Sequence, residues 1–127
     1  MKLLISGSRD ATEPLLAYAR ACVQRARDNG WMIICGDAFG VDWQVVEHCQ
    51  RLGVSYMSYG TKDYPRNGAS HYTRLDVADY TARDRWLVEQ ADKVMCITTQ
   101  EGTPGTLAVY EYALEVGKEC WLKRGNE

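Results

Sequence analysis

Three short glycine-rich loops carry the residue types that bind anions: Gly7-Ser8-Arg9, residues 36–40 and residues 102–106. Glycine lets the backbone come close to a ligand, and an arginine adds a fixed cation with forked donors. Where such a loop leads into a helix, the free amides of the first helical turn attract phosphate. Each loop is equally well explained as a plain tight turn. The hypothesis of an anion site therefore depends on the three loops meeting in space.

Alternation of apolar runs with helical patterns predicts that they do meet. Apolar runs of this kind are typical of parallel strands covered on both faces, so we expect an α/β, three-layer Rossmann-like fold. Its mainly parallel five-stranded sheet has helices on both faces, and residues 1–127 form a single domain. Ligands of such sheets bind beyond the carboxyl ends of the strands, where the three loops would lie. The expected strands are 2–6, 31–35, 54–59, 93–99 and 119–122, and the expected helices start at residues 12, 41, 81 (with capping-box spacing) and 106.

Arg83 falls in the first turn of an expected helix, where a cation opposes the helix dipole by about 0.3–1 kcal/mol. Such an arginine is most easily explained if it holds an anion. Pairing with Asp79 or Asp84 at the surface is an equally weighted alternative.

Two aspartates are candidates for contact with a sugar hydroxyl or for proton transfer. Asp37 directly follows the second expected strand, and Asp42 falls in the first turn of the next helix. For Asp42 we favour a plain role as partner of the helix dipole. For Asp37 a ligand contact and a hydrogen bond to its own loop are equally weighted. No nucleophile with an evident base stands out, and no metal site is predicted.

The composition of the chain argues against some classes of binding partner. The formal net charge of −2 and pI near 5.7 disfavour nucleic-acid binding through a general basic field. No apolar run is long enough to cross a membrane, and no export signal is evident, so we expect a cytoplasmic protein with no membrane partner. The five cysteines (Cys22, Cys35, Cys49, Cys96 and Cys120) read as small apolar residues in a reducing compartment.

Aromatic residues and one long loop complete the expected site. Phe39, Trp43, Tyr59 and Tyr64 fall on or near the expected crevice, where one of them could stack a base. Residues 60–79 have no apolar periodicity, which favours a functional lid or a flexible loop. The excess of aromatic residues also leaves open that the protein is a homo-oligomer.

Four motifs together resemble the SLOG superfamily: residues 5–10, residues 36–42, Arg83-Asp84-Arg85 running into residues 91–92, and Gly105-Thr106 opening a helix. That superfamily joins the Smf/DprA DNA-processing proteins, the LOG phosphoribohydrolases and small YspA-like Rossmannoid proteins, which this chain resembles most. The resemblance covers residues 3–122 and implies a nucleotide-binding domain. Loop positions and resemblance together give the candidate ligand-binding residues Gly7, Ser8, Arg9, Gly36, Asp37, Gly40, Arg83, Gly102, Gly105 and Thr106.

The chain departs from the LOG pattern at the residues that matter for catalysis. The glutamate that LOG enzymes carry three residues after the threonine is Val109 here, and the lysine after their arginine is Asp84. We therefore expect a sensor or binding module for a nucleotide or nucleotide-derived phosphorylated ligand. The alternatives are a phosphoribohydrolase-like or nucleotide-cleaving hydrolase, with Asp37 and Arg83 as catalytic candidates, and a protein-interaction module with an empty pocket.

Overall fold

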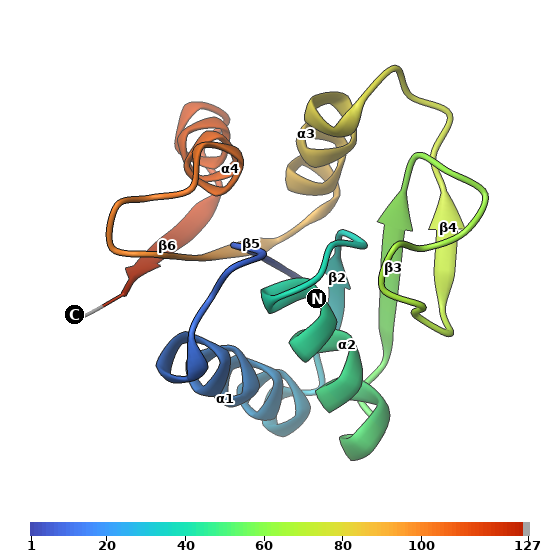
Figure 1. Cartoon of the computed structure of the whole chain (residues 1–127), viewed down its shortest axis with the longest axis vertical. Coiled ribbons are helices and arrows are strands. Elements are labelled where there is room, and N and C mark those ends of the chain that lie inside the picture. The colour runs from blue at the N-terminus through green and yellow to red at the C-terminus, as the bar shows by residue number, and fades with distance from the viewer. Residues whose placement is uncertain (126–127) are drawn as a thin grey trace.

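Six parallel strands form one sheet in the order β4-β3-β2-β1-β5-β6, in a computed structural model that describes residues 1–125 (Figure 1). The strands are β1 (Lys2–Gly7), β2 (Met32–Cys35), β3 (Tyr56–Gly60), β4 (Tyr72–Arg74), β5 (Lys93–Thr98) and β6 (Glu119–Arg124). The helices are α1 (Glu13–Asn29), α2 (Val41–Leu52), α3 (Tyr80–Gln90) and α4 (Pro104–Glu115).

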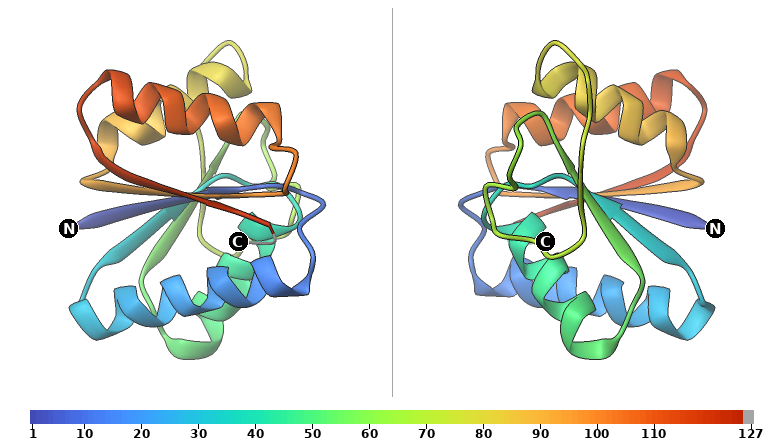
Figure 2. Two further views of the ribbon diagram at one scale, coloured as in Figure 1. Left: turned by 90° about the vertical axis from the view of Figure 1, so that its left-hand side faces the viewer. Right: turned by 90° about the vertical axis from the view of Figure 1, so that its right-hand side faces the viewer.

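Helices cover both faces of the sheet, which confirms the α/β Rossmann-like class. α1 and α2 lie on one face, and α3 and α4 lie on the other (Figures 1 and 2). β1 shows why its sequence is apolar throughout: Leu3 and Ile5 pack into the core beneath α1 and α2, whereas Leu4 packs into the core beneath α3 and α4. Because alternate side chains point to opposite faces, a strand with two covered faces needs apolar residues at successive positions.

The predicted number of strands was wrong, because the sheet has six strands and not five. The additional strand, β4, lies within residues 60–79, which the sequence indicated only as a loop. β4 is three residues long, lies at the edge of the sheet, and exposes Thr73 and Arg74 to solvent. A strand so short and polar has no apolar period, and only pairing with β3 defines it.

The start of α3 also differs from its prediction. The helix begins after Asp79, whose side chain accepts a hydrogen bond from the Ala82 amide at 2.8 Å. Thr81 is therefore a residue of the first turn and not the cap, so the capping-box interpretation was wrong. Aspartate caps well because its carboxylate accepts from a free amide and faces the positive end of the helix dipole.

The order of the strands indicates where a ligand-binding crevice would lie. From β1 the chain adds β2, β3 and β4 on one side, and then β5 and β6 on the other side. The β1–α1 and β5–α4 loops therefore leave neighbouring strands toward opposite faces of the sheet, and ligands of this fold class bind where such loops separate. Among residues 1–125, no helix is sufficiently long and apolar to cross a lipid bilayer.

Candidate functional site

A cleft of about 510 Å³ opens at the carboxyl ends of β1 and β2, between the first turns of α3 and α4. Segments that are distant in the sequence form its walls, as the sheet topology requires. It is lined by Leu4, Ser6, Gly7, Arg9, Gly36, Ala38, Asp42, Arg66, Tyr80, Arg83, Asp84, Leu87, Thr103, Pro104, Gly105, Thr106 and Val109.

The structure brings six of the ten candidate ligand-binding residues to this cleft, and four lie elsewhere. Those that line it are Gly7, Arg9, Gly36, Arg83, Gly105 and Thr106. Ser8, Asp37, Gly40 and Gly102 are not part of its lining.

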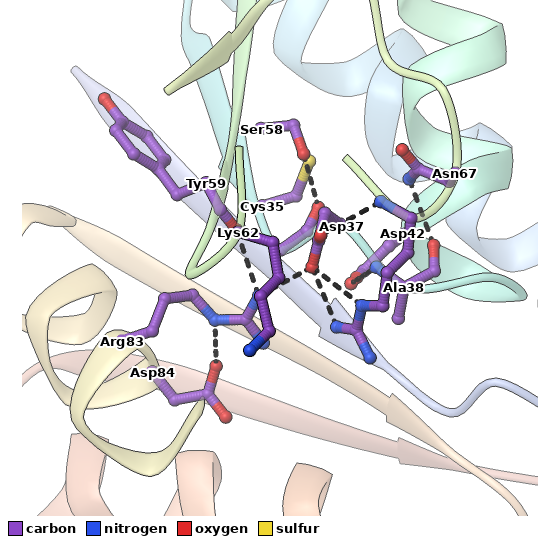
Figure 3. Close-up of polar contacts among 12 residues, drawn as sticks. Cys35, Asp37, Ala38, Asp42, Ser58, Tyr59, Lys62, Asn67, Arg83 and Asp84 are labelled. Carbon is purple, nitrogen blue, oxygen red and sulfur yellow. Dashed lines mark hydrogen bonds and ion pairs between the residues drawn. The ribbon is translucent and has the colours of Figure 1, made fainter. Parts of the chain in front are cut away.

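Asp37 does not line the cleft, but it is fully buried and accepts hydrogen bonds from two arginines that do (Figure 3). Its Oδ1 accepts hydrogen bonds from Arg66 Nη2 at 2.8 Å and from Arg83 Nη1 at 3.1 Å, and its Oδ2 accepts from the Arg66 amide at 3.0 Å. Burial raises the pKa of the carboxyl, but hydrogen bonds and charge from Arg66, with the charge of Arg83, outweigh it, so the net pKa is lowered. Asp37 is thus an ionised anchor for two arginines.

Arg83 does hold an anion, and that anion belongs to the protein. Its side chain is buried, with Nε donating to Asp84 at 2.8 Å and Nη1 donating to both Asp37 and the Tyr59 carbonyl (Figure 3). The pairing with Asp84 is one of the two predicted alternatives, although it is largely buried and not at the surface. The Asp79 carboxylate, the other predicted partner, instead accepts from the Ala82 amide and caps α3.

Each of these arginines keeps donors for a ligand. Nη1 of Arg66 and Nη2 of Arg83 donate to no protein acceptor among the residues that the structure describes, and both side chains line the cleft. Arg9, the third arginine of the lining, is exposed. A guanidinium with one edge fixed by Asp37 presents its other edge in a set direction, as recognition of phosphate or carboxylate requires.

Two carboxyl groups line the cleft, and both have raised pKa values. Burial raises the pKa of Asp42 to about 7, against the opposing charge of Arg83, while its Oδ2 accepts a hydrogen bond from the Ala38 amide at 3.1 Å. Burial also raises the pKa of Asp84, partly offset by Arg83. A carboxyl that titrates near neutral pH can donate or accept a proton, so Asp42 is better suited to proton transfer than the buried anion Asp37.

A hydroxyl network joins the first loop to the start of α4. Ser8 is buried, and its Oγ lies 3.1 Å from Thr98 Oγ1 and 2.5 Å from Thr103 Oγ1. The Thr103 amide donates to Thr98 Oγ1 at 2.7 Å. The Thr103 hydroxyl is engaged with Ser8 and does not cap α4. Among the described residues, no side chain accepts from the amides of Gly105 and Thr106 in the first turn of this helix.

The aromatic lining differs from its prediction. Phe39, Trp43, Tyr59 and Tyr64 do not line the cleft, and Tyr59 instead packs against Trp86, with ring centroids 4.9 Å apart. The aromatic side chain of the cleft is that of Tyr80. The guanidinium carbons of Arg66 and Arg83 both lie over its ring, at 4.2 and 4.9 Å from the centroid. These cation–π contacts help to hold both arginines in place.

Arg66 and Tyr80 are the functional candidates that sequence reasoning missed. Arg66 lies in the polar stretch 60–79, where one arginine among several charged residues carries no signal. In the structure this stretch is fixed against the β2–α2 loop, since Asn67 is buried and donates to the Ala38 carbonyl at 3.0 Å. The expectation of a lid over the site stays a prediction.

Metal ligands are not gathered at this site. Within residues 1–125, no group of three or more histidine, cysteine or acidic side chains is arranged to hold a metal ion. Cys35, Cys49 and Cys96 are buried in the core, as the apolar interpretation predicted, and Cys22 and Cys120 are half-buried.

Sequence comparison adds no assignment: no protein-family model matches the chain, and no curated protein matches it in sequence. Solved structures do match. The molybdenum cofactor carrier protein of Chlamydomonas reinhardtii superposes with a TM-score of 0.82 at 18% identity, covering 98% of this chain and 77% of its own. The molybdenum cofactor binding protein of Rippkaea orientalis superposes with a TM-score of 0.83 at 19% identity and the same coverage.

DNA processing protein A of Helicobacter pylori, described for its single-stranded DNA binding mode, is a further match. Its TM-score is 0.77 at 19% identity, over 100% of this chain and 67% of that protein. At such identities the likeness demonstrates the fold. The chain thus shares its fold with a DNA processing protein A, one of the groups that its four motifs resemble.

Proposed function

We propose that the cleft binds a phosphorylated small molecule of the nucleotide class, with a phosphate on the first turn of α4. The observation that carries this proposal is the open start of that helix. A Cβ atom added at Gly105 would meet no other part of residues 1–125 within 4 Å, and both Gly105 and Thr106 line the cleft. The amides of a first turn need acceptors, and the helix dipole favours an anionic one.

The arginines of the cleft also support binding of an anion. Arg9, Arg66 and Arg83 offer donors toward an anion, while Asp37 and Asp84 balance part of their charge. The cleft therefore offers hydrogen-bond donors in fixed directions but little net positive charge. This suits a small anionic ligand better than a long polyanion. A cleft of about 510 Å³ also falls in the range typical of pockets for small ligands.

The structural neighbours support a ligand of cofactor size. Two of them are described as carrying or binding the molybdenum cofactor. A cofactor of that kind is a second ligand class for the same cleft, to be compared directly with nucleotides. Single-stranded DNA is a third, since the Helicobacter pylori neighbour is described as binding it.

The test is a titration of the protein with nucleoside mono-, di- and triphosphates, the unphosphorylated nucleosides, pyrophosphate and a single-stranded oligonucleotide. We expect phosphorylated small molecules to raise the melting temperature, because ligand at about 100 times its Kd adds about 2.7 kcal/mol to the free energy of unfolding. Equal responses to nucleosides and their phosphates would contradict the proposal.

A matched pair of variants locates the phosphate. Gly105→Asp and Gly105→Asn differ mainly in charge, and the Cβ atom of either side chain has no described neighbour within 4 Å. We expect Gly105→Asp to weaken phosphate binding at least about tenfold more than Gly105→Asn, because a carboxylate repels an anion a few ångströms away. The same charge should leave the fold equally or more stable, since a first-turn aspartate favours the helix dipole. Equal affinities for the two variants would remove α4 from the site.

Asp42 favours a second candidate function, hydrolysis of a bond in the bound ligand. Its carboxyl has a pKa of about 7 and lines the cleft beside Arg83. We expect such an enzyme to lose turnover in Asp42→Asn while it keeps ligand affinity. Chromatography of the ligand after incubation with the protein would detect the products. An intact ligand after long incubation would contradict hydrolysis and support a binding function only.

A further inference from the structure

Two bonded side chains of the cleft, Asp84 and Arg83, each keep one polar atom without a partner (Figure 3). Asp84 Oδ1 accepts a hydrogen bond from Arg83 Nε at 2.8 Å, whereas its Oδ2 accepts from no donor among residues 1–125. Nη2 of Arg83 likewise donates to no acceptor in this part of the chain. Every fully buried side-chain nitrogen or oxygen of the described residues has a partner. The two free atoms therefore reach solvent, and both side chains line the cleft.

Asp84 lies close to the start of α4, where we place the phosphate. A groove of about 180 Å³ continues the cleft between α3 and α4. Asp84 and Gly105 line both the cleft and this groove. A ligand with its phosphate on the first turn of α4 therefore has the part next to that phosphate beside Asp84.

The free atoms of Asp84 and Arg83 are matched by a hydroxyl group. They belong to side chains that are bonded to each other, so one small ligand group can meet both. A phosphate oxygen could only accept from Arg83, and the Asp84 carboxylate would repel it. An amino group could only donate to Asp84. A hydroxyl donates its hydrogen to the carboxylate and accepts from the guanidinium with a lone pair.

The ion pairs also make Arg83 better suited to a neutral oxygen than to a phosphate. Arg83 pairs with two carboxylates, Asp37 and Asp84, whereas Arg66 pairs with Asp37 alone and Arg9 is exposed. Arg66 and Arg9 therefore have more charge to offer an anion. The remaining donor of the buried Arg83 has a set direction, because the carboxylates fix the planar guanidinium.

We infer that Asp84, together with Arg83, recognises a free hydroxyl on the sugar of the ligand. The inference rests on the proposed function, because it places the sugar next to a phosphate on α4. In a nucleoside 5′-phosphate the phosphate and the vicinal hydroxyls belong to one sugar, so one cavity can hold both. Asp37, a candidate for this contact from the sequence, is occupied by Arg66 and Arg83. Within a DNA strand no sugar has a free hydroxyl, so such a site selects against single-stranded DNA.

The test compares ribonucleotides with their 2′,3′-dideoxy counterparts by titration calorimetry on the wild-type protein, over the mono-, di- and triphosphates of the four common nucleosides. We expect each nucleotide that binds to lose affinity at least about tenfold without its hydroxyls, because two partly buried polar atoms are then left unpaired. Equal affinities of the two forms would overturn the inference and leave the proposed function intact. Binding of neither form would overturn the proposed function and the inference with it.

A matched pair of variants assigns the preference to Asp84. In Asp84→Asn the amide oxygen can keep the bond to Arg83, so that an NH2 donor replaces the free acceptor. We expect this variant to lose most of the preference for the hydroxylated form, whatever happens to the affinity that both forms share. Asp10→Asn makes the same change of charge at an exposed position beside Arg9 and should keep the wild-type preference. An unchanged preference in Asp84→Asn would overturn the inference, and the comparison on the wild type tests it even if this variant fails to fold.

Discussion

The β2–α2 loop and the start of α4 are both rich in glycine, yet they use it in opposite ways. In the loop, a side chain at Gly36 would come within 2.8 Å of Asp42 Oδ2, and one at Gly40 would come within 2.4 Å of the Ser8 carbonyl. These glycines make room for the protein's own atoms. At the start of α4, a Cβ atom at Gly105 would meet nothing within 4 Å in the described part of the chain, so the space next to this backbone is open.

The same contrast applies to the charged groups. Asp37, in the β2–α2 loop, has both oxygens occupied by Arg66 and Arg83. By contrast, no side chain in the described part of the chain caps the first turn of α4. A glycine-rich loop therefore indicates close approach of the backbone to something, and only the packing decides whether that is protein or ligand.

Asp37→Asn should have the largest effect, a loss of about 3–5 kcal/mol in the free energy of unfolding. It removes the counter-charge of Arg66 and of the buried Arg83 while it keeps the shape of the side chain. Denaturation in urea measures the loss. As a control, Asp63→Asn breaks the exposed ion pair with Arg74 in the same stretch and should cost less than about 1 kcal/mol. Similar losses in both variants would mean that Asp37 is no anchor.

Gly40→Ala should destabilise the protein by about 2–5 kcal/mol, since both the backbone angle and the space at this position require glycine. Gly40 has φ +73° and lies against the carbonyl groups of Ser8 and Arg9. Gly53→Ala is the matched control, with φ +71° and no atom within 4 Å. The difference between their unfolding free energies isolates the steric part, and equal losses would show that the loop is not tightly packed.

Asp42→Asn should make the protein less sensitive to pH. Because the pKa of Asp42 is raised to about 7 in the folded protein, the folded state holds a proton that the unfolded chain releases near pH 4. The contribution of Asp42 to the free energy of unfolding of the wild type is therefore greatest below about pH 4 and falls as the pH rises toward 7. We expect the variant to match the wild type near pH 4 and to be more stable by about 2–4 kcal/mol at pH 8. Urea titrations of both proteins at the two pH values test this, and a constant difference would contradict it.

Gly105→Ala should have the smallest effect and the opposite sign, a gain of about 0.5–1 kcal/mol. Alanine favours the helix, and the added methyl group enters open space. Gly36→Ala is the comparison, since its methyl group would meet Asp42 and Arg83, and it should destabilise the protein. Thermal melting of the two variants ranks them directly. A destabilised Gly105→Ala would show that the start of α4 is as closely packed as the β2–α2 loop.

Sequence reasoning predicted the fold well, because the fold depends on patterns that are local in the chain. Apolar runs such as residues 31–35 and the helical spacing of Leu15, Ala19 and Val23 are set by which faces each element must bury. The motifs placed Gly7, Arg9 and Arg83 at one edge of the sheet, where the structure has them. β4 was missed because pairing with β3, and not its own composition, makes it a strand.

By itself the sequence determined the alternation of strands and helices, and with it the edge at which the loops meet. Only the tertiary structure decided which charges meet there. Pairing of Arg83 with its neighbour Asp84 was one of the predicted alternatives, but its bond to Asp37 follows from packing across 46 residues of chain. Arg66 reaches the same carboxylate from a loop without any pattern. Burial of apolar side chains repeats along the chain and can be read from it, whereas one ion pair between distant segments leaves no periodic trace.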